Sequence, residues 1–435
     1  RPPRSTLFPY TTLFRSDMGI LTGLALNCEI AHKCKFDRKQ YFYPDLPKGY
    51  QISQYDEPIC GKGYLMVNGK KIGITRAHLE EDAGKLVHAG ADGLAGSSYS
   101  LVDLNRAGTP LLEIVSEPDM RSPQEAREYM EELRNIVRYV GVCDGNLEEG
   151  SMRCDANISI MPKGSNKFGT RAEIKNVNSF KALERALEYE IDRQIELVED
   201  GEEVVQETRL WDDNAGVTRS MRGKEDAHDY RYFPEPDLMP LEISQEWIDR
   251  IKATMPELPE QKRQRYMDLG LSEYDASVIV AQYELAMFFD EVLKAGGNPK
   301  IAVNFLMGEI AAYLKEQKLS INETKLTPES LVELIGLIEK ATISNNIGKQ
   351  IIVEMMETGE KASAIVEKKG LSQISDTGAI KEIAQKIIEA NPSQVEAYRG
   401  GKDKLFGFFV GQVMKETKGR ANPQSVNQIL KELLG

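Results

Sequence analysis

Acidic residues in two places carry the strongest chemical signal in this sequence. Glu80, Glu81 and Asp82 are consecutive and follow shortly after a histidine. A single carboxylate, Glu113, lies inside the apolar run Pro110–Val115. A lone charge in an apolar strand is costly unless a partner compensates it, and a divalent cation shared with the acidic cluster would do so. Oxygen ligands favour Mg²⁺ over Zn²⁺. The alternative is a solvated acidic loop beside an unrelated strand.

Two further segments present polar side chains in alternation with apolar ones. In Arg153–Ile160, the residues Arg153 and Asp155 belong to the polar face, and Thr170–Lys175 repeats the pattern with Lys175. Alternation with a period of two predicts half-buried strands of an antiparallel sheet. We therefore treat Arg153, Asp155 and Lys175 as candidate catalytic residues on a polar face shared by two neighbouring strands. The alternative is that this face is simply exposed to solvent.

Hairpin and helix signals indicate how these residues are positioned. Two strand-like runs flank Asn68-Gly69, which predicts a hairpin closed by a type I′ turn. The second run, Lys70–Arg76, leads directly to the acidic cluster, so we expect the cluster at the end of a strand. Glu113 lies on another strand, which feeds a helix that begins at Ser122-Pro123.

The pattern of the chain changes near residue 245. From Asp17 to about Ser244, strand and helix signals are mixed, which predicts an α+β domain built on an antiparallel sheet. Beyond that point the periodicity is helical alone, with expected helices that include Ala276–Ala295 and Lys300–Gln317. A polar residue before a proline gives a start signal for three of the helices, at Asn298, Thr327 and Asn422.

Composition bounds the class of protein. A chain of 435 residues should contain two or three domains. The net charge is −13, yet residues 366–435 hold 11 Lys and Arg against 8 Asp and Glu, which allows phosphate contact at the C-terminal end only. No apolar run approaches the roughly 20 residues that span a bilayer, so we expect the protein to have no membrane partner. Five cysteines without a CxxC pair predict reduced thiols in a cytoplasmic protein.

Common catalytic motifs are absent from the sequence. It contains no GxxxxGK[ST] phosphate loop, no GxGxxG after a strand and no GxSxG elbow. Its four histidines are too scattered for a histidine-based zinc centre. Any nucleotide chemistry must therefore use a metal ion, carboxylates and Arg or Lys on the surface of a sheet.

A series of motifs, in order, resembles one protein family. They are Phe36–Asp45, Tyr50–Tyr55, His78–Lys85, Leu101–Gly108, Leu112–Asp119, Glu148–Asn157, Ile174–Phe180 and Asp229–Asp237. On these motifs the sequence is similar to the GatB family, which supplies one subunit of the tRNA-dependent amidotransferases. The resemblance extends over nearly all of the chain after Asp17.

The resemblance implies a fold and a function. The fold would be a cradle-shaped domain at residues 17–245, a helical domain at 246–365 and a YqeY-like tRNA-binding tail at 366–435. The family uses ATP and Mg²⁺ to phosphorylate the side-chain carboxylate of Glu-tRNA(Gln) or Asp-tRNA(Asn). Ammonia from a partner amidase (glutaminase) then displaces the phosphate, and a small third subunit holds the complex together. Glu81 and Glu113 match the metal-binding carboxylates of the family.

The first sixteen residues do not resemble the rest of the chain. They repeat Thr-Leu-Phe and resemble translated adapter DNA, so we interpret residues 1–16 as a non-native leader. The family's Gly-Leu-Glu-Val-His stretch, whose Glu and His complete the metal site, is not found. We therefore expect the chain as written not to amidate misacylated tRNA. A non-catalytic tRNA-binding scaffold is the alternative, and a metal-dependent nuclease that uses the acidic cluster is a third hypothesis.

Overall fold

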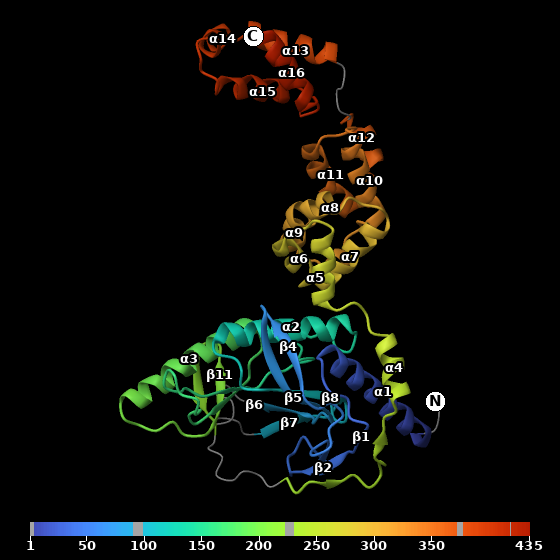
Figure 1. The fold of residues 1–435 in the computed structure, drawn as a ribbon, viewed down its shortest axis with the longest axis vertical. Coiled ribbons are helices and arrows are strands. Elements are labelled where there is room, and N and C mark those ends of the chain that lie inside the picture. Colours follow the sequence, from blue (N-terminus) through green and yellow to red (C-terminus); the bar gives the residue numbers. More distant parts are fainter. Residues whose placement is uncertain (1–3, 90–98, 222–229, 372–376, 418) are drawn as a thin grey trace. The chain divides into compact units, whose positions relative to one another are not determined.

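A computed structural model describes residues 4–89, 99–221, 230–371, 377–417 and 419–435. The chain divides into two compact units, residues 1–259 and 260–435. Every described strand lies in the first unit, and the second unit is helical (Figure 1). This confirms the predicted α+β class with helices following a strand-containing domain. Asp229 of the last family motif lies outside the described residues.

The acidic cluster belongs to a three-stranded sheet with the order β4-β5-β8. These strands are β4 (Gly63–Val67), β5 (Lys70–Glu81) and β8 (Pro110–Ser116), and all neighbours are antiparallel. Asn68 and Gly69 join β4 to β5 with φ angles of 47° and 78°. Two positive φ angles define a type I′ turn, so the predicted hairpin is confirmed.

The remaining described strands form four more sheets. A four-stranded sheet has the order β12 (Val217–Ser220), β11 (Thr208–Asp212), β10 (Ala172–Lys175) and β9 (Ala156–Ile158). A three-stranded sheet has the order β13 (Phe233–Pro234), β2 (Asp37–Gln40) and β3 (Tyr50–Ser53). The two-stranded sheets pair β1 (Lys33–Cys34) with β14 (Leu241–Glu242), and β6 (Lys85–Ala89) with β7 (Tyr99–Asp103). Among these described pairs only β10 and β11 are parallel.

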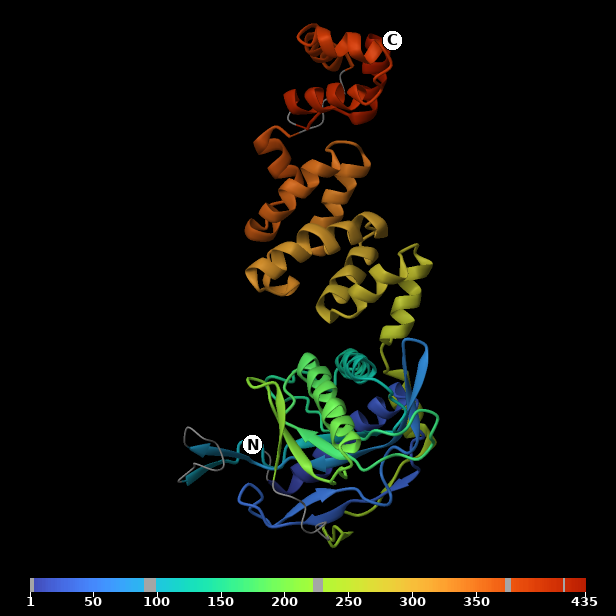
Figure 2. The same ribbon diagram turned by 90° about the vertical axis from the view of Figure 1, so that its left-hand side faces the viewer.

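Two long helices pack against each other in the first unit, α2 (Pro123–Tyr139) and α3 (Phe180–Glu199) (Figure 2). Ser122 caps α2, since its hydroxyl accepts a hydrogen bond of 3.1 Å from the Glu125 amide. The Glu125 carboxylate accepts hydrogen bonds from the Arg121 amide and from Lys70. Gly141, with φ 73°, follows the end of α2.

One hydrophobic core joins the elements of the first unit. Its fully buried members include Ile20 of α1 (Arg4–Ala25), Ile74 of β5, Leu183 of α3 and Trp211 of β11. The helix α1 is continuous through residue 16, and the side chain of Ser16 is buried. The interpretation of residues 1–16 as a leader stays a prediction.

The boundary of the first unit lies beyond α4 (Gln245–Ala253). This helix packs on α1, where Trp247 Nε1 donates a hydrogen bond of 2.6 Å to the Asp17 carboxylate. The contacts therefore divide the chain after Pro259 rather than after residue 245. The three predicted domains, 17–245, 246–365 and 366–435, stay a prediction.

Helical start signals are confirmed in the second unit. Asn298, Thr327 and Asn422 each accept hydrogen bonds from the first turn of α8 (Pro299–Phe305), α10 (Pro328–Glu339) and α16 (Pro423–Leu434). The expected helix Ala276–Ala295 is instead two helices, α6 (Glu273–Val280) and α7 (Tyr283–Lys294). The expected helix at 300–317 contains a π-helical turn, Leu306–Ile310, before α9 (Ala311–Gln317). The remaining α-helices of this unit before residue 377 are α5 (Pro259–Asp268), α11 (Asn345–Thr358) and α12 (Ala362–Lys369).

The last four helices have a hydrophobic core of their own. They are α13 (Thr377–Glu389), α14 (Pro392–Arg399), α15 (Leu405–Glu416) and α16. Phe409, Val413 and Leu430 are fully buried in this core.

Two whole-chain expectations can be compared with the structure. In the described parts of the chain, no helix combines the length and apolar character that crossing a bilayer requires. All five cysteines are free thiols, and Cys28, Cys34 and Cys60 are buried.

Candidate functional site

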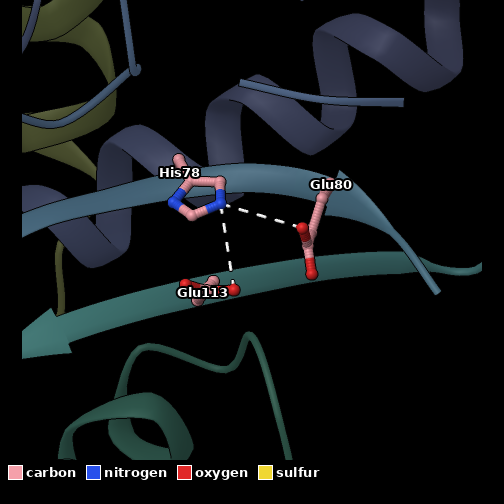
Figure 3. Close-up of side chains that lie close together, drawn as sticks. All are labelled: His78, Glu80 and Glu113. Carbon is pink, nitrogen blue, oxygen red and sulfur yellow. Dashed lines mark ion pairs between the residues drawn. The ribbon is translucent and has the colours of Figure 1, made fainter. Parts of the chain in front are cut away.

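His78, Glu80 and Glu113 form a cluster of potential metal ligands on the paired strands β5 and β8. One ligand atom from each residue lies within 4.8 Å of the others. His78 is directly opposite Glu113 in the register, and Glu80 follows two residues later on β5. Opposite residues, and residues two apart on one strand, project from the same face of a sheet. Figure 3 shows the three side chains converging over the two strands.

The cluster is buried on one side and open on the other. His78 and Glu80 are buried, whereas the side chain of Glu113 is 46% exposed. Burial by itself would raise the pKa of Glu80, but the contact with His78 and the nearby charge of Lys39 outweigh it and lower that pKa. The Ser53 hydroxyl also donates a hydrogen bond of 3.2 Å to Glu80. Glu80 is therefore held as a carboxylate, ready to face a cation.

The orientation of the His78 ring bears on metal binding. Arg76 Nε donates a hydrogen bond of 3.4 Å to His78 Nδ1, and His78 Nε2 lies 3.7 Å from Glu80 and 4.0 Å from Glu113. A neutral imidazole has one donor and one acceptor nitrogen, so the proton lies on Nε2 in this arrangement. A cation bound at Nε2 would require the other tautomer, and the contact with Arg76 would be given up.

The predicted metal ligand Glu81 lies elsewhere. As the neighbour of Glu80 in a strand, it projects from the opposite face of the sheet. Its carboxylate forms an ion pair with Lys48 and accepts a hydrogen bond of 3.0 Å from the Ile52 amide. The structure thus brings Glu113 together with His78 and Glu80, and not with Glu81. A ligand role for Glu81 stays a prediction.

Arg153, a predicted catalytic residue, lies before β9 rather than on it. Its guanidinium forms an ion pair with Asp82, the residue that follows the end of β5. The same Asp82 oxygen accepts a hydrogen bond of 2.7 Å from Arg106. Arg153 is thereby tied to the acidic segment that contains Glu80.

The other two predicted catalytic residues form a pair. Lys175 Nζ lies 2.7 Å from the Asp155 carboxylate and 3.3 Å from that of Glu173. Burial would lower the pKa of Lys175, but the Asp155 hydrogen bond and the charges of Asp155 and Glu173 outweigh it and raise that pKa. Lys175 is therefore a fixed cation on the four-stranded sheet.

Tyrosines beside the cluster were not predicted from the sequence. Tyr232 stacks on Tyr55 with ring centroids 4.3 Å apart, and the ring of Tyr230 lies 6.1 Å from that of Tyr232. Burial raises the pKa of Tyr232 to about 12, and the charges of Glu80 and Glu113 act in the same direction. The sequence signal that could have indicated these tyrosines is the run of aromatic residues after residue 229.

Comparisons with known proteins agree across both units. A family described as "GatB/GatE catalytic domain" matches residues 9–249, and one described as "GatB domain" matches residues 287–434. The B subunit of the aspartyl/glutamyl-tRNA(Asn/Gln) amidotransferase from a Synechococcus strain is 56% identical over 424 residues, which cover 96% of this chain and 86% of the relative. The B subunit of the glutamyl-tRNA(Gln) amidotransferase from Physcomitrium patens, named chloroplastic/mitochondrial, is 58% identical over 95% of this chain and 75% of its own length.

Proposed function

This chain belongs to the GatB family of amidotransferase subunits, and we propose that its first unit carries out the ATP-dependent step of tRNA-dependent amidation. The substrate would be Glu-tRNA(Gln), Asp-tRNA(Asn) or both. The partners would be an amidase (glutaminase), which releases ammonia from glutamine, and a small third subunit. The C-terminal helices, with their separate core, would bind tRNA. A cytoplasmic location is part of the proposal and is supported by the five free cysteines.

The proposed chemistry turns a poor acyl donor into a good one. An oxygen of the side-chain carboxylate attacks the γ-phosphorus of ATP, and ADP leaves. Ammonia then attacks the carbonyl carbon of the acyl phosphate, inorganic phosphate leaves, and the nitrogen loses a proton to give the amide. Both reactants of the first step are anions, so the protein must supply positive charge and hold the groups in line.

The residues of the cluster fit a divalent cation. Two ligands of one Mg²⁺ lie at most about 4.2 Å apart, so ligand atoms already within 4.8 Å need only small shifts in position. Binding at His78 Nε2 would also require the other tautomer of the ring and loss of the Arg76 contact. His78, Glu80 and Glu113 would hold the ion, and water would complete its preferred octahedral shell. When bound, Mg²⁺ would neutralise phosphate charge. Lys175 and Arg153 would add fixed positive charge, and Asp155 would orient Lys175.

The His78–Glu80–Glu113 cluster is the observation that carries the proposal. The test is to purify the chain with its partner subunits and supply Mg²⁺, ATP and misacylated tRNA. Because His78, Glu80 and Glu113 lie together on β5 and β8, we expect ADP release stimulated by the misacylated tRNA, together with formation of Gln-tRNA or Asn-tRNA. That result would contradict the expectation from the sequence that the chain as written does not amidate misacylated tRNA. Binding of tRNA with ATP left intact would contradict the proposal and support the non-catalytic scaffold instead. Cleavage of the tRNA would support the nuclease.

A further inference from the structure

The side chain of Asp82 lies between two arginines that come from distant parts of the sequence. Its Oδ2 atom accepts from Nη2 of Arg106, at 2.7 Å, and from Nη2 of Arg153. The Asp82 side chain is only 9% exposed, whereas Arg106 is 39% and Arg153 51% exposed. A buried carboxylate therefore holds two guanidinium groups that remain accessible to solvent.

Most of the hydrogen-bonding capacity of these arginines is open. Each guanidinium has five N–H donors. Among the residues that the structure describes, Arg153 bonds to Asp82 alone, and Arg106 bonds to Asp82 and to the Gly150 carbonyl at 3.2 Å. One carboxylate against two guanidiniums leaves a net positive charge. A guanidinium presents its donors as a planar fork that matches the oxygens of a phosphate or carboxylate group, and here two such forks lie side by side.

The backbone fixes Arg106 and Asp82 relative to each other. The Asp82 amide donates to the Thr109 carbonyl at 2.8 Å, and the Gly108 amide donates to the Asp82 carbonyl at 2.9 Å. Gly150 lies directly against the guanidinium of Arg106, since a Cβ atom at this glycine would be 3.1 Å from Arg106 Nη1. Gly150 also has a φ of 74°, which L side chains rarely adopt. The position of Arg106 is therefore set by its surroundings before any ligand binds.

The two arginines lie near the His78–Glu80–Glu113 cluster. Asp82 follows Glu80 by two residues along an extended chain, which is about 7 Å. Burial raises the pKa of Tyr41 to about 12, and the charges of Glu80 and Asp82 act in the same direction. Both carboxylates therefore lie close enough to the Tyr41 hydroxyl to act on it. A cation at the cluster and the two arginines could thus contact different oxygens of one anionic ligand.

We propose that Arg106 and Arg153, held side by side by Asp82, form an oxyanion-binding clamp for a phosphate or carboxylate group, with Asp82 as its positioning residue. The inference rests on the proposed function for the source of the oxyanion, which is either the phosphate chain of the nucleotide or the carboxylate of the aminoacyl group. The clamp brings positive charge to the place where two anions must meet.

The experiment compares Asp82→Asn, Arg106→Gln and Arg106→Lys in the complex with its partner subunits. Asp82→Asn keeps the shape of the side chain and removes its charge. Asp213→Asn is the matched control, since Asp213 pairs with Arg185 at 3.1 Å elsewhere in the first unit. Three quantities are measured for each variant: binding of inorganic phosphate by calorimetry, KM and kcat for ATP and for misacylated tRNA, and the melting temperature.

We expect Arg106→Gln to weaken phosphate binding about 10- to 100-fold, the usual effect of losing a hydrogen bond to a charged group. Asp82→Asn should weaken it by a smaller factor, because both arginines remain but lose the carboxylate that holds them side by side. Arg106→Lys should fall between Arg106→Gln and the wild type, because lysine keeps the charge and loses the fork. Asp213→Asn should leave all three quantities unchanged. A rise in KM for ATP alone identifies the nucleotide phosphate as the ligand, and a rise for misacylated tRNA alone identifies the aminoacyl carboxylate.

Unchanged phosphate binding and unchanged KM values in Asp82→Asn and Arg106→Gln would overturn the clamp. So would a loss that follows the melting temperature alone, because that would indicate a merely structural role. If the wild-type complex leaves ATP intact but the variants still lose phosphate binding, the proposed function fails and the clamp stands. If ATP is cleaved with unchanged constants in every variant, the proposed function stands and the clamp fails.

Discussion

His78 and Glu113 are direct partners in the β5–β8 register, with 4.0 Å between His78 Nε2 and a Glu113 carboxylate oxygen. This pairing decides which acidic residue of β5 completes the cluster. Glu80 shares the face of His78, because it is two residues further along, and Glu81 does not. The identity of the third ligand is therefore a consequence of strand register.

The first prediction compares two neighbouring carboxylates. In the complex with its partner subunits, we expect Glu80→Gln to lower ATP cleavage about 100-fold or more and to raise the Mg²⁺ concentration needed for half-maximal rate. Glu113→Gln should behave in the same way. Glu81→Gln is the matched control and should leave the Mg²⁺ requirement unchanged, because that carboxylate faces Lys48 and the Ile52 amide. A Mg²⁺ requirement raised by Glu81→Gln and not by Glu80→Gln would favour the ligand that the family resemblance implies.

The second prediction concerns the charge of Lys175. Because its pKa is raised above the ordinary value of about 10.4, Lys175 stays protonated at every pH between about 6 and 9. We expect Lys175→Met to lower the amidation rate about 100-fold, by the same factor at every pH in this range. Lys175→Arg should retain most of the activity. Lys163→Met, an exposed lysine between β9 and β10, serves as the control. A changed pH optimum in Lys175→Arg would show that Lys175 acts as a proton carrier rather than a fixed cation.

The third prediction uses a buried charge network in the first unit. Glu190 is fully buried and accepts hydrogen bonds from Gln194 at 3.0 Å and Thr218 at 2.9 Å, while it forms ion pairs with Arg193 and Arg209. We expect Glu190→Gln to cost about 3 kcal/mol in the free energy of unfolding at pH 7, because the buried Arg209 and the half-buried Arg193 lose one of their two acidic partners and keep only Glu207. Glu188→Gln, on the exposed side of the same helix, should cost little.

The same network gives a pH dependence. Burial would raise the pKa of Glu190, but the hydrogen bonds from Arg193 and Gln194 outweigh it and lower that pKa. A lowered pKa contributes stability that is complete above the unfolded value of about 4.3 and is lost as pH falls through the folded value. Urea unfolding at pH 7 and below pH 4 should therefore show the difference between wild type and Glu190→Gln shrinking in acid. A constant difference would contradict this assignment.

The fourth prediction separates tRNA binding from ATP chemistry. Phe409 is fully buried in the core of the last four helices, so Phe409→Ala should destabilise them by about 3–5 kcal/mol. We expect weaker tRNA binding in a filter-binding assay, with Mg²⁺ affinity of the first unit unchanged. Phe408→Ala, which removes a neighbouring and only partly buried ring, should have a smaller effect. Hydrogen exchange of the backbone amides would report whether the last four helices are still folded. Full tRNA affinity in a variant whose amides exchange rapidly there would show that these helices do not bind tRNA.

Local signals in the sequence were reliable where neighbouring residues decide the structure. The type I′ turn needed only Asn68 and Gly69, and the helix starts needed only a polar cap before a proline. The break between α6 and α7 carries neither glycine nor proline, since it falls at Ala281 and Gln282, so no local pattern indicated it. Packing against other helices overrides periodicity there.

The site shows the same limit. A register irregularity between Ile74 and Arg76 shifts the rest of β5 by one residue relative to β8. A shift of one residue exchanges the two faces of a strand, so the sequence could not distinguish Glu80 from Glu81 as the partner of Glu113. The contact of Arg153 with Asp82 was likewise invisible, because it joins segments that are distant in sequence. Asp155 and Lys175, which the alternation placed on polar faces of neighbouring strands, form an ion pair of 2.7 Å, although Asp155 precedes β9.

The parallel pairing of β10 with β11 has a consequence for how the molecule is made. Because parallel neighbours require a long crossover connection, the strand that ends at Lys175 cannot gain β11 as a neighbour until all of α3 has been synthesised and has turned back. Pairing between strands that are distant in sequence forms slowly, because the chain loses conformational entropy before the contacts between the strands stabilise it. Leu210, which pairs with Lys175 in the register, should therefore reach its native position late in folding, after the local β4–β5 hairpin has formed.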